Sequence, residues 1–240
     1  RFVGPEPLVD TCVIAFRGSE RFSNVESDID VVKVTLPEDW RCPGCASMSG
    51  FYSAWSGVED RVLQLLEEIH CGRGSGRGVF LTGHSMGGAA AVLGAFALRN
   101  KHGLDVRGVY TFEAPRTGND VFVRSFEASF GSIPQWRITH DRDPVVHLPL
   151  VAFGFEHLPN EIFYDSDGAY HLCNGTEDAA CSNQFSPPWL WRASDHCSTP
   201  LTPSGSICRC EGWVPLAAQA ATLNRGPGGD APAAERSWLI

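Results

Sequence analysis

Ser85 lies between two glycines in the segment Gly-His-Ser-Met-Gly, residues 83–87 of this 240-residue chain. Residues 79–82 are apolar or β-forming and residues 88–93 are an alanine-rich run that favours a helix, so the order predicts a strand, a sharp turn and a helix. A serine at the apex of such a turn exposes its hydroxyl, because the flanking glycines carry no Cβ atoms that would collide. The helix points its free N–H groups and its positive dipole end at the place where an oxyanion would form. Ser85 is therefore the candidate nucleophile, although a bare Gly-x-Ser-x-Gly also arises by chance.

A serine hydroxyl is a poor nucleophile near neutral pH. It needs an imidazole to take its proton and a carboxylate to orient that imidazole. After a turn of this type the aspartate and then the histidine follow in chain order. Of the eight histidines, His84 adjoins Ser85 and is expected to point away, while His70 and His102 are explained as caps of predicted helix ends. The candidate bases that remain are His140, His147, His157, His171 and, last in order, His196.

Asp143 is the candidate acid. It lies in the turn Asp141-Arg-Asp-Pro144 at the end of a predicted strand, and it precedes a proline that fixes the backbone. Asp141, two residues away, is the alternative. A turn-capping aspartate would occupy the same position, so a purely structural role for Asp143 stays open.

The segments between these residues alternate between strand and helix patterns. This alternation predicts an α/β fold with a mostly parallel central sheet and helices on both faces. Chemistry in such sheets lies beyond the carboxyl ends of the strands, and Ser19, Ser85, Pro115 and Asp143 each follow a predicted strand, so they could converge at one edge. The expected strands are 11–16, 31–36, 79–82, 108–112, 136–139 and 161–164, and the expected helices are 52–70, 86–101 and 120–130.

Composition limits the class of protein and of partner. A hydrophobic content of 43% supports one domain, expected over 1–202, whereas 203–240 is rich in proline, glycine and alanine and is expected to be a tail. The formal net charge of −9 argues against a nucleic-acid partner and favours neutral substrates. The longest apolar or small run, 87–98, is too short to span a bilayer, so no transmembrane segment is expected.

Nine cysteines are many for a cytosolic enzyme, and their short separations favour disulfides in an oxidising compartment. Secretion is the better interpretation, and a glycosylation sequon at 174–176 agrees with it. Zinc held by the cysteine pairs 42/45 and 208/210 is the less favoured alternative, because the second pair is too closely spaced. The odd number leaves at least one thiol free or paired between chains, and Cys12, inside an apolar strand, is the expected free thiol.

Further motifs occur in the order seen in the fungal-type class 3 lipases, and the chain resembles that family from about Thr11 to His196. The resemblance covers most of the chain and uses several independent motifs. They are Phe16-Arg-Gly-Ser19, Gly83-His-Ser-Met-Gly-Gly88, Thr111-Phe-Glu-Ala-Pro-Arg-Thr-Gly-Asn119, Asp143-Pro-Val-Val-His-Leu-Pro149, Gly154-Phe-Glu-His157, Cys173 to Cys181-Ser-Asn183, and Asp195-His196.

The resemblance implies an α/β-hydrolase fold in which Ser85 is the nucleophile, Asp143 the orienting acid and His196 the base. It also implies an oxyanion hole formed by Ser19, through its backbone N–H and its hydroxyl, together with the backbone N–H of Met86. Removing one such donor costs on the order of a hundredfold or more in rate.

The resemblance has structural implications as well. Family members have a helix and a strand before the strand at 11–16, so the fold is expected to be shortened at its N-terminus. A disulfide between Cys173 and Cys181 and a lid over 20–30 are implied in the same way. Apolar side chains between Leu148 and Phe155 could line an acyl groove, or they could pack in the core or in loops.

These observations favour a secreted serine esterase or lipase that acts on acylglycerols or related carboxylic esters through an acyl-enzyme. No cofactor or metal is expected. The expected partners are a lipid or small ester substrate and, transiently, a lipid surface. The polar character of 20–30 would also suit a feruloyl-type esterase of polar esters, and a catalytically silent relative that binds lipid or a partner is the alternative from another class.

Overall fold

The computed structural model describes residues 10–18, 32–198, 201 and 208. Ser19, the lid expected over 20–30 and, apart from Cys208, the tail expected over 203–240 lie outside these residues. The lid, the tail and the domain boundary at 202 therefore stay predictions.

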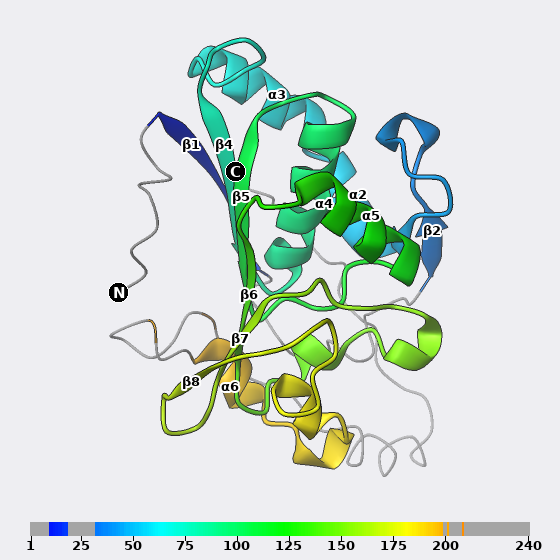
Figure 1. Cartoon of the computed structure of the whole chain (residues 1–240), viewed down its shortest axis with the longest axis vertical. Helices are drawn as coiled ribbons and strands as arrows, with labels where there is room; N and C mark the ends of the chain where they lie inside the picture. The colour runs from blue at the N-terminus through cyan, green and yellow to red at the C-terminus, as the bar shows by residue number, and fades with distance from the viewer. Residues whose placement is uncertain (1–9, 19–31, 199–200, 202–207, 209–240) are drawn as a thin grey trace, which may run out of the picture.

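A six-stranded sheet forms the centre of the molecule (Figure 1), and its order is β1-β4-β5-β6-β7-β8. Neighbouring strands from β1 to β7 run parallel, and β8 is antiparallel to β7 at the edge. The mostly parallel α/β sheet predicted from the sequence is confirmed. The strands are β1 (Thr11–Phe16), β4 (Gly78–His84), β5 (Val106–Phe112), β6 (Gln135–His140), β7 (Glu161–Tyr164) and β8 (Tyr170–Leu172).

A second, two-stranded sheet pairs β2 (Lys33–Thr35) with β3 (Ala46–Met48) in antiparallel register. The sequence predicted the first of these strands but not the second. The prediction of a single helix over 52–70 is wrong, because the structure has two helices there, α2 (Ser49–Ser56) and α3 (Glu59–Glu68). Gly57, a residue that favours helix ends, stands at the break, and its N–H closes α2 on the carbonyl of Ser53.

Two longer helices, α4 (Met86–Asn100) and α5 (Asp120–Phe130), are formed as expected. The sequence did not predict α6 (Ala193–Cys197), which is five residues long. Short 3-10 turns complete the described chain: η1 (Glu38–Trp40), η2 (Val145–His147), η3 (Val151–Phe153), η4 (Ser182–Phe185) and η5 (Pro188–Leu190).

Helix α4 is the centre of the hydrophobic core, and its residues 87–98 are all buried. It packs against β4 and β5, while α2 and α5 lie beside it on the same side of the sheet (Figure 1). Small residues allow this close approach: a Cβ on Gly94 would lie 2.7 Å from the ring of Trp55. Phe96 of this helix packs against the rings of Trp40 and Phe122, and Phe126 and Phe130 extend the aromatic cluster.

Four disulfides join cysteines of the described residues: Cys12–Cys71, Cys42–Cys45, Cys173–Cys181 and Cys197–Cys208. The Cys173–Cys181 pair confirms the expected bond. The expectation that Cys12 is a free thiol is wrong. Because β1 pairs with β4, Cys12 lies opposite Val79, and the loop from α3 brings Cys71 back to that end of β4, with 6.3 Å between the two Cα atoms. Cys210, the ninth cysteine, lies outside the described residues.

Replacing Cys12 and Cys71 together by alanine is expected to lower the free energy of unfolding by about 4 kcal/mol, because the bond closes a loop of 59 residues in the unfolded chain. The matched control replaces Cys42 and Cys45, which are also buried but only 3 residues apart, and the same loop-closure argument gives about 1.5 kcal/mol. Guanidinium unfolding of both double variants measures the difference. Equal losses would refute the loop-closure explanation.

Candidate active site

Ser85 occupies the turn between β4 and α4, as the sequence predicted. The residue is buried, at 2% exposure, so the expectation of an exposed hydroxyl is wrong. Its backbone has φ 56° and ψ −132°, a strained conformation for a residue with a side chain. The turn is fixed on the neighbouring strand, because the Ser85 N–H donates to the carbonyl of Phe112 at the end of β5 (2.9 Å). Such strain in a tightly held turn is typical of nucleophile positions in this kind of sheet.

Close backbone approach explains two of the glycines around Ser85. A Cβ on Gly87 would collide with the backbone of Phe16 and Arg17, and a Cβ on Gly83 would collide with the backbone of Gly87. A Cβ on Gly18 would lie 3.0 Å from the Cβ of Ser85. Gly18, which follows β1 and directly precedes Ser19, therefore lies against Ser85.

Asp143 follows β6 and is completely buried, at 0% exposure. Its Oδ1 accepts a hydrogen bond from the Val145 N–H (2.7 Å), and its own N–H donates to the carbonyl of His140 (3.2 Å). These bonds hold the carboxylate in one orientation. The remaining oxygen, Oδ2, faces α6.

His196 lies on α6, and its Nδ1 is 2.9 Å from Oδ2 of Asp143. The imidazole donates this hydrogen bond to the carboxylate, which fixes the tautomer with the basic lone pair on Nε2. His196 is also completely buried, at 0% exposure. The structure thus brings together two of the residues that were predicted to act with Ser85.

Two further imidazoles hold α6 against the ends of the strands. The Nε2 of His84 lies 3.0 Å from the backbone oxygen of His196, and the Nδ1 of His140 lies 3.1 Å from that of Asp195. The rings of His84 and His196 are 4.6 Å apart. His84 directly precedes Ser85, so these contacts place His196 beside the turn that carries the serine. The expectation that His84 points away is therefore wrong, because its ring lies against His196 and anchors α6.

Burial and neighbouring charges shift the pKa values of Asp143 and His84 at the site. Burial alone would raise the pKa of Asp143, but the charge of His196 and hydrogen bonds from His196 and Val145 outweigh it and lower the pKa. Burial, and then the charge of His196, lowers the pKa of His84 to about 4. Near neutral pH, Asp143 is therefore ionised and His84 is neutral.

Arg116, in the motif that follows β5, holds the loop after Asp143. Its N–H donates to the carbonyl of Leu148 (2.8 Å), and its buried guanidinium donates to the carbonyls of His147 and Pro149 and to the carboxylate of Glu177 (2.8 Å). Charge-assisted bonds of this kind make Arg116 the fixed point of the loop.

The other histidine candidates lie away from this arrangement. Burial lowers the pKa values of His147, to about 4, and of His157, whose Nε2 lies 2.6 Å from the carbonyl of Val146. His171 is exposed and pairs with Asp165. Among the apolar residues expected for an acyl groove, Phe155 belongs to the core, whereas Leu150, Val151 and Phe153 are exposed.

Glu113 is a buried residue of this region that sequence reasoning did not single out. It directly follows β5, has φ 50°, and accepts a hydrogen bond from the His140 N–H (3.0 Å). A glutamate after a strand ordinarily indicates a solvated turn, so its type gave no signal. The signal that existed was a charged residue inside the motif Phe112-Glu-Ala-Pro-Arg116.

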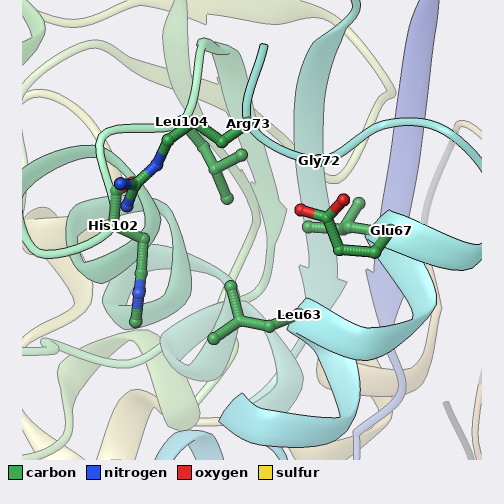
Figure 2. Close-up of a pocket in the computed structure, with 7 residues that line it drawn as sticks. Leu63, Glu67, Gly72, Arg73, His102 and Leu104 are labelled. Carbon is green, nitrogen blue, oxygen red and sulfur yellow. The ribbon is translucent and has the colours of Figure 1, made fainter. Parts of the chain in front are cut away.

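A cavity of about 240 Å³ lies at the other end of the strands (Figure 2). Its lining comes from α3 and from the loops before β4 and β5, that is, from the amino ends of those strands. Ser85 follows the carboxyl end of β4, so this cavity is not part of the candidate site. The lining residues are Leu63, Leu66, Glu67, Gly72, Arg73, His102 and Leu104.

The zinc alternative is not supported, because Cys42, Cys45 and Cys208 form disulfides. Two groups of side chains in the described residues have the spacing of metal ligands, and both contain disulfide-bonded sulfurs, which are not the thiolates that bind metals. Among the described helices, none combines the length and the apolar character needed to cross a membrane.

Comparison with known proteins gives consistent matches. The family described as lipase (class 3) matches residues 13–153. The secreted mono- and diacylglycerol lipase A of Penicillium cyclopium is 34% identical over 154 residues, which are 64% of this chain and 48% of that protein. A lipase of Rhizomucor miehei is 33% identical over 183 residues, 74% of this chain and 49% of that protein. The chain thus spans about half the length of these relatives.

Solved structures extend the likeness to three dimensions. The Rhizomucor miehei lipase in its propeptide complex matches with a TM-score of 0.69 and 29% identity, over 84% of this chain and 63% of that chain. A triacylglycerol lipase whose catalytic centre is described as a serine protease triad matches with a TM-score of 0.67 and 31% identity, over 79% and 71% of the two chains.

Proposed function

Because the chain belongs to the class 3 lipase family, we propose that it is a secreted serine esterase that hydrolyses acylglycerols through an acyl-enzyme. The observation that carries the proposal is the buried Asp143–His196 hydrogen bond, held beside the strained turn of Ser85. Ester hydrolysis by an activated hydroxyl requires a serine, an imidazole that takes its proton and a carboxylate that orients the imidazole.

In the proposed reaction, Ser85 Oγ attacks the ester carbonyl while His196 Nε2 takes its proton. The imidazolium that forms is stabilised by ionised Asp143, and it then returns the proton to the leaving alcohol. Water attacks the acyl-enzyme by the same route. The backbone N–H of Met86, the first residue of α4, and the N–H and hydroxyl of Ser19 are proposed to bind the oxyanion.

Secretion is part of the proposal. Four disulfides in the described residues suit an oxidising compartment, and two relatives carry the description of secreted mono- and diacylglycerol lipases. We also propose transient contact with a lipid surface. The exposed side chains of Val151 and Phe153, on the 3-10 turn η3 in the segment that follows Asp143, are consistent with it.

The substrate class is tested by measuring turnover of the full chain on monoacyl-, diacyl- and triacylglycerols of one acyl chain and on methyl ferulate, with and without detergent micelles. Turnover of one or more acylglycerols that exceeds turnover of methyl ferulate is the expected result. The Ser85→Ala chain supplies the enzyme blank.

Other results would replace the proposal. Preference for methyl ferulate would favour an esterase of polar esters. No turnover on any of the four substrates, by protein that unfolds cooperatively, would refute the enzyme proposal and favour a silent relative that binds lipid.

A further inference from the structure

Glu113 is a completely buried carboxyl group, at 0% exposure, at the point where β5 ends. Its N–H donates to the carbonyl of Ile138 in β6 (2.8 Å), and its Oε2 accepts from the N–H of His140 (3.0 Å). The residue has φ 50°, in the left-handed region that most side chains avoid. Backbone strain and burial of a carboxyl group both cost free energy, and such costs are typical of residues with a function.

The surroundings of the second carboxyl oxygen of Glu113 indicate the protonation state of this side chain. Oε1 is buried, and within the described part of the chain no donor reaches it. Two acidic groups are among the strongest influences on Glu113: Asp143 first, from the turn after β6, and then Asp195 from α6. An ionised Glu113 would therefore have an unsatisfied buried oxygen facing a second carboxylate. A proton on Oε1 would turn this oxygen into a donor, and Asp143 would supply the acceptor.

We propose that Glu113 is a positioning residue that keeps its proton at neutral pH and donates a hydrogen bond to Asp143. The proposal rests on the proposed function for its catalytic part, because it assigns Glu113 a role behind the acid of the triad. It assigns the buried residue no contact with substrate. Glu113 acts on His196 only through Asp143.

Electrostatics agree with this geometry. Burial, and then the charge and the hydrogen bond of Asp143, raise the pKa of Glu113 well above its ordinary value of 4.5. The same hydrogen bond helps to lower the pKa of Asp143. One carboxyl group of the pair is thus kept neutral and the other charged, which is the usual outcome when two such groups share a buried site.

The hydrogen bond has two consequences for the reaction. It fixes the Asp143 carboxylate in the orientation in which Oδ2 faces Nδ1 of His196, and it leaves the negative charge on Asp143 and not on Glu113. Deprotonation of Glu113 at alkaline pH would place a second negative charge behind the acid and remove the donor. Activity should therefore fall as Glu113 ionises.

Two variants separate the hydrogen bond from the mere presence of a side chain. Glu113→Gln keeps an amide donor for Asp143 and an acceptor for the His140 N–H, and kcat at neutral pH is expected to stay within about threefold of wild type. Glu113→Gly suits the positive φ but removes the donor, and kcat is expected to fall about ten- to hundredfold with little change in KM. The exposed carboxyl of Glu127 on α5 provides the control, Glu127→Gln.

The pH profile gives a further readout. In wild type the ionisation of Glu113 should produce a fall of kcat on the alkaline side, and this fall should be absent in Glu113→Gln, because glutamine does not ionise. A glycine variant with wild-type kcat, or a glutamine variant as slow as the glycine variant, would overturn the positioning role.

The proton itself can be tested without any ester substrate. Because the pKa of Glu113 is raised in the folded state, its carboxyl group contributes fully to the free energy of unfolding of wild type below pH 4.5. This contribution is lost as pH rises towards the folded-state pKa. The melting temperature of Glu113→Gln relative to wild type should therefore rise between pH 4 and pH 8, while that of Glu127→Gln relative to wild type should not. A constant difference for Glu113→Gln would refute the protonated state. Wild type without turnover would refute the proposed function, and the melting difference would still decide whether Glu113 holds a proton.

Discussion

The Ser85→Ala variant is expected to hydrolyse esters with a kcat about a millionfold below wild type. The hydroxyl is the group that forms the acyl-enzyme, and no neighbouring side chain can replace it in this turn. Any rate that remains would come from oxyanion binding and substrate orientation. Steady-state hydrolysis of a soluble p-nitrophenyl ester measures the loss.

A covalent label makes this test independent of substrate choice. An organophosphonate ester should modify wild type at the peptide that contains Ser85, and mass spectrometry should find no label in the variant. Ser53→Ala, which changes an exposed serine on α2, is the matched control and should keep both activity and labelling. Activity of Ser85→Ala within tenfold of wild type would refute the acyl-enzyme mechanism.

The turn of Ser85 could be predicted because its determinants are local. The turn depends on glycines 83 and 87, on the apolar residues before them and on the small residues after them. All of these residues are neighbours in sequence as well as in the structure. Asp143 was predictable for a related reason. In a parallel sheet the residue that follows a strand is placed at the carboxyl edge by the strand alone.

His196 could not be predicted in this way. It lies on a helix of five residues, too short for an apolar period to appear, and its position depends on contacts with His84, Asp143 and the turn at Arg142. Family order, and not local pattern, identified it. The edge strand β8 was missed for the same reason, since its three residues are exposed and carry no alternation of burial.

Cys12 and Glu113 show where residue type misleads. An apolar strand around Cys12 suggested a buried free thiol, yet its partner Cys71 comes from a loop 59 residues away, and the pairing of β1 with β4 brings them together. Glu113 is a charged residue in a turn motif, and only the arrangement of β5, β6 and α6 shows that it is buried beside another carboxyl group. Both facts are tertiary, so no window of sequence contains them.

Asp143→Asn is expected to lower kcat about ten-thousandfold with little change in folding. Asparagine has nearly the same shape, but its amide group can donate to Nδ1 of His196, which would leave the proton on Nε2. A base with that nitrogen already protonated cannot accept the proton of Ser85. The measurement is kcat on the same soluble ester, together with a thermal melt of each variant.

Asp141→Asn supplies the matched control, and it also decides between the two aspartates that the sequence left open. Asp141 is buried two residues away, but its backbone N–H donates to Tyr164 and its side chain makes no contact with His196 among the described hydrogen bonds. Its φ of 34° suits asparagine as well as aspartate, so the variant should fold and keep most of its activity. If Asp141→Asn loses activity and Asp143→Asn keeps it, the acid has been assigned to the wrong residue. If both lose it equally, the turn as a whole, and not the Asp143–His196 hydrogen bond, is what the reaction depends on.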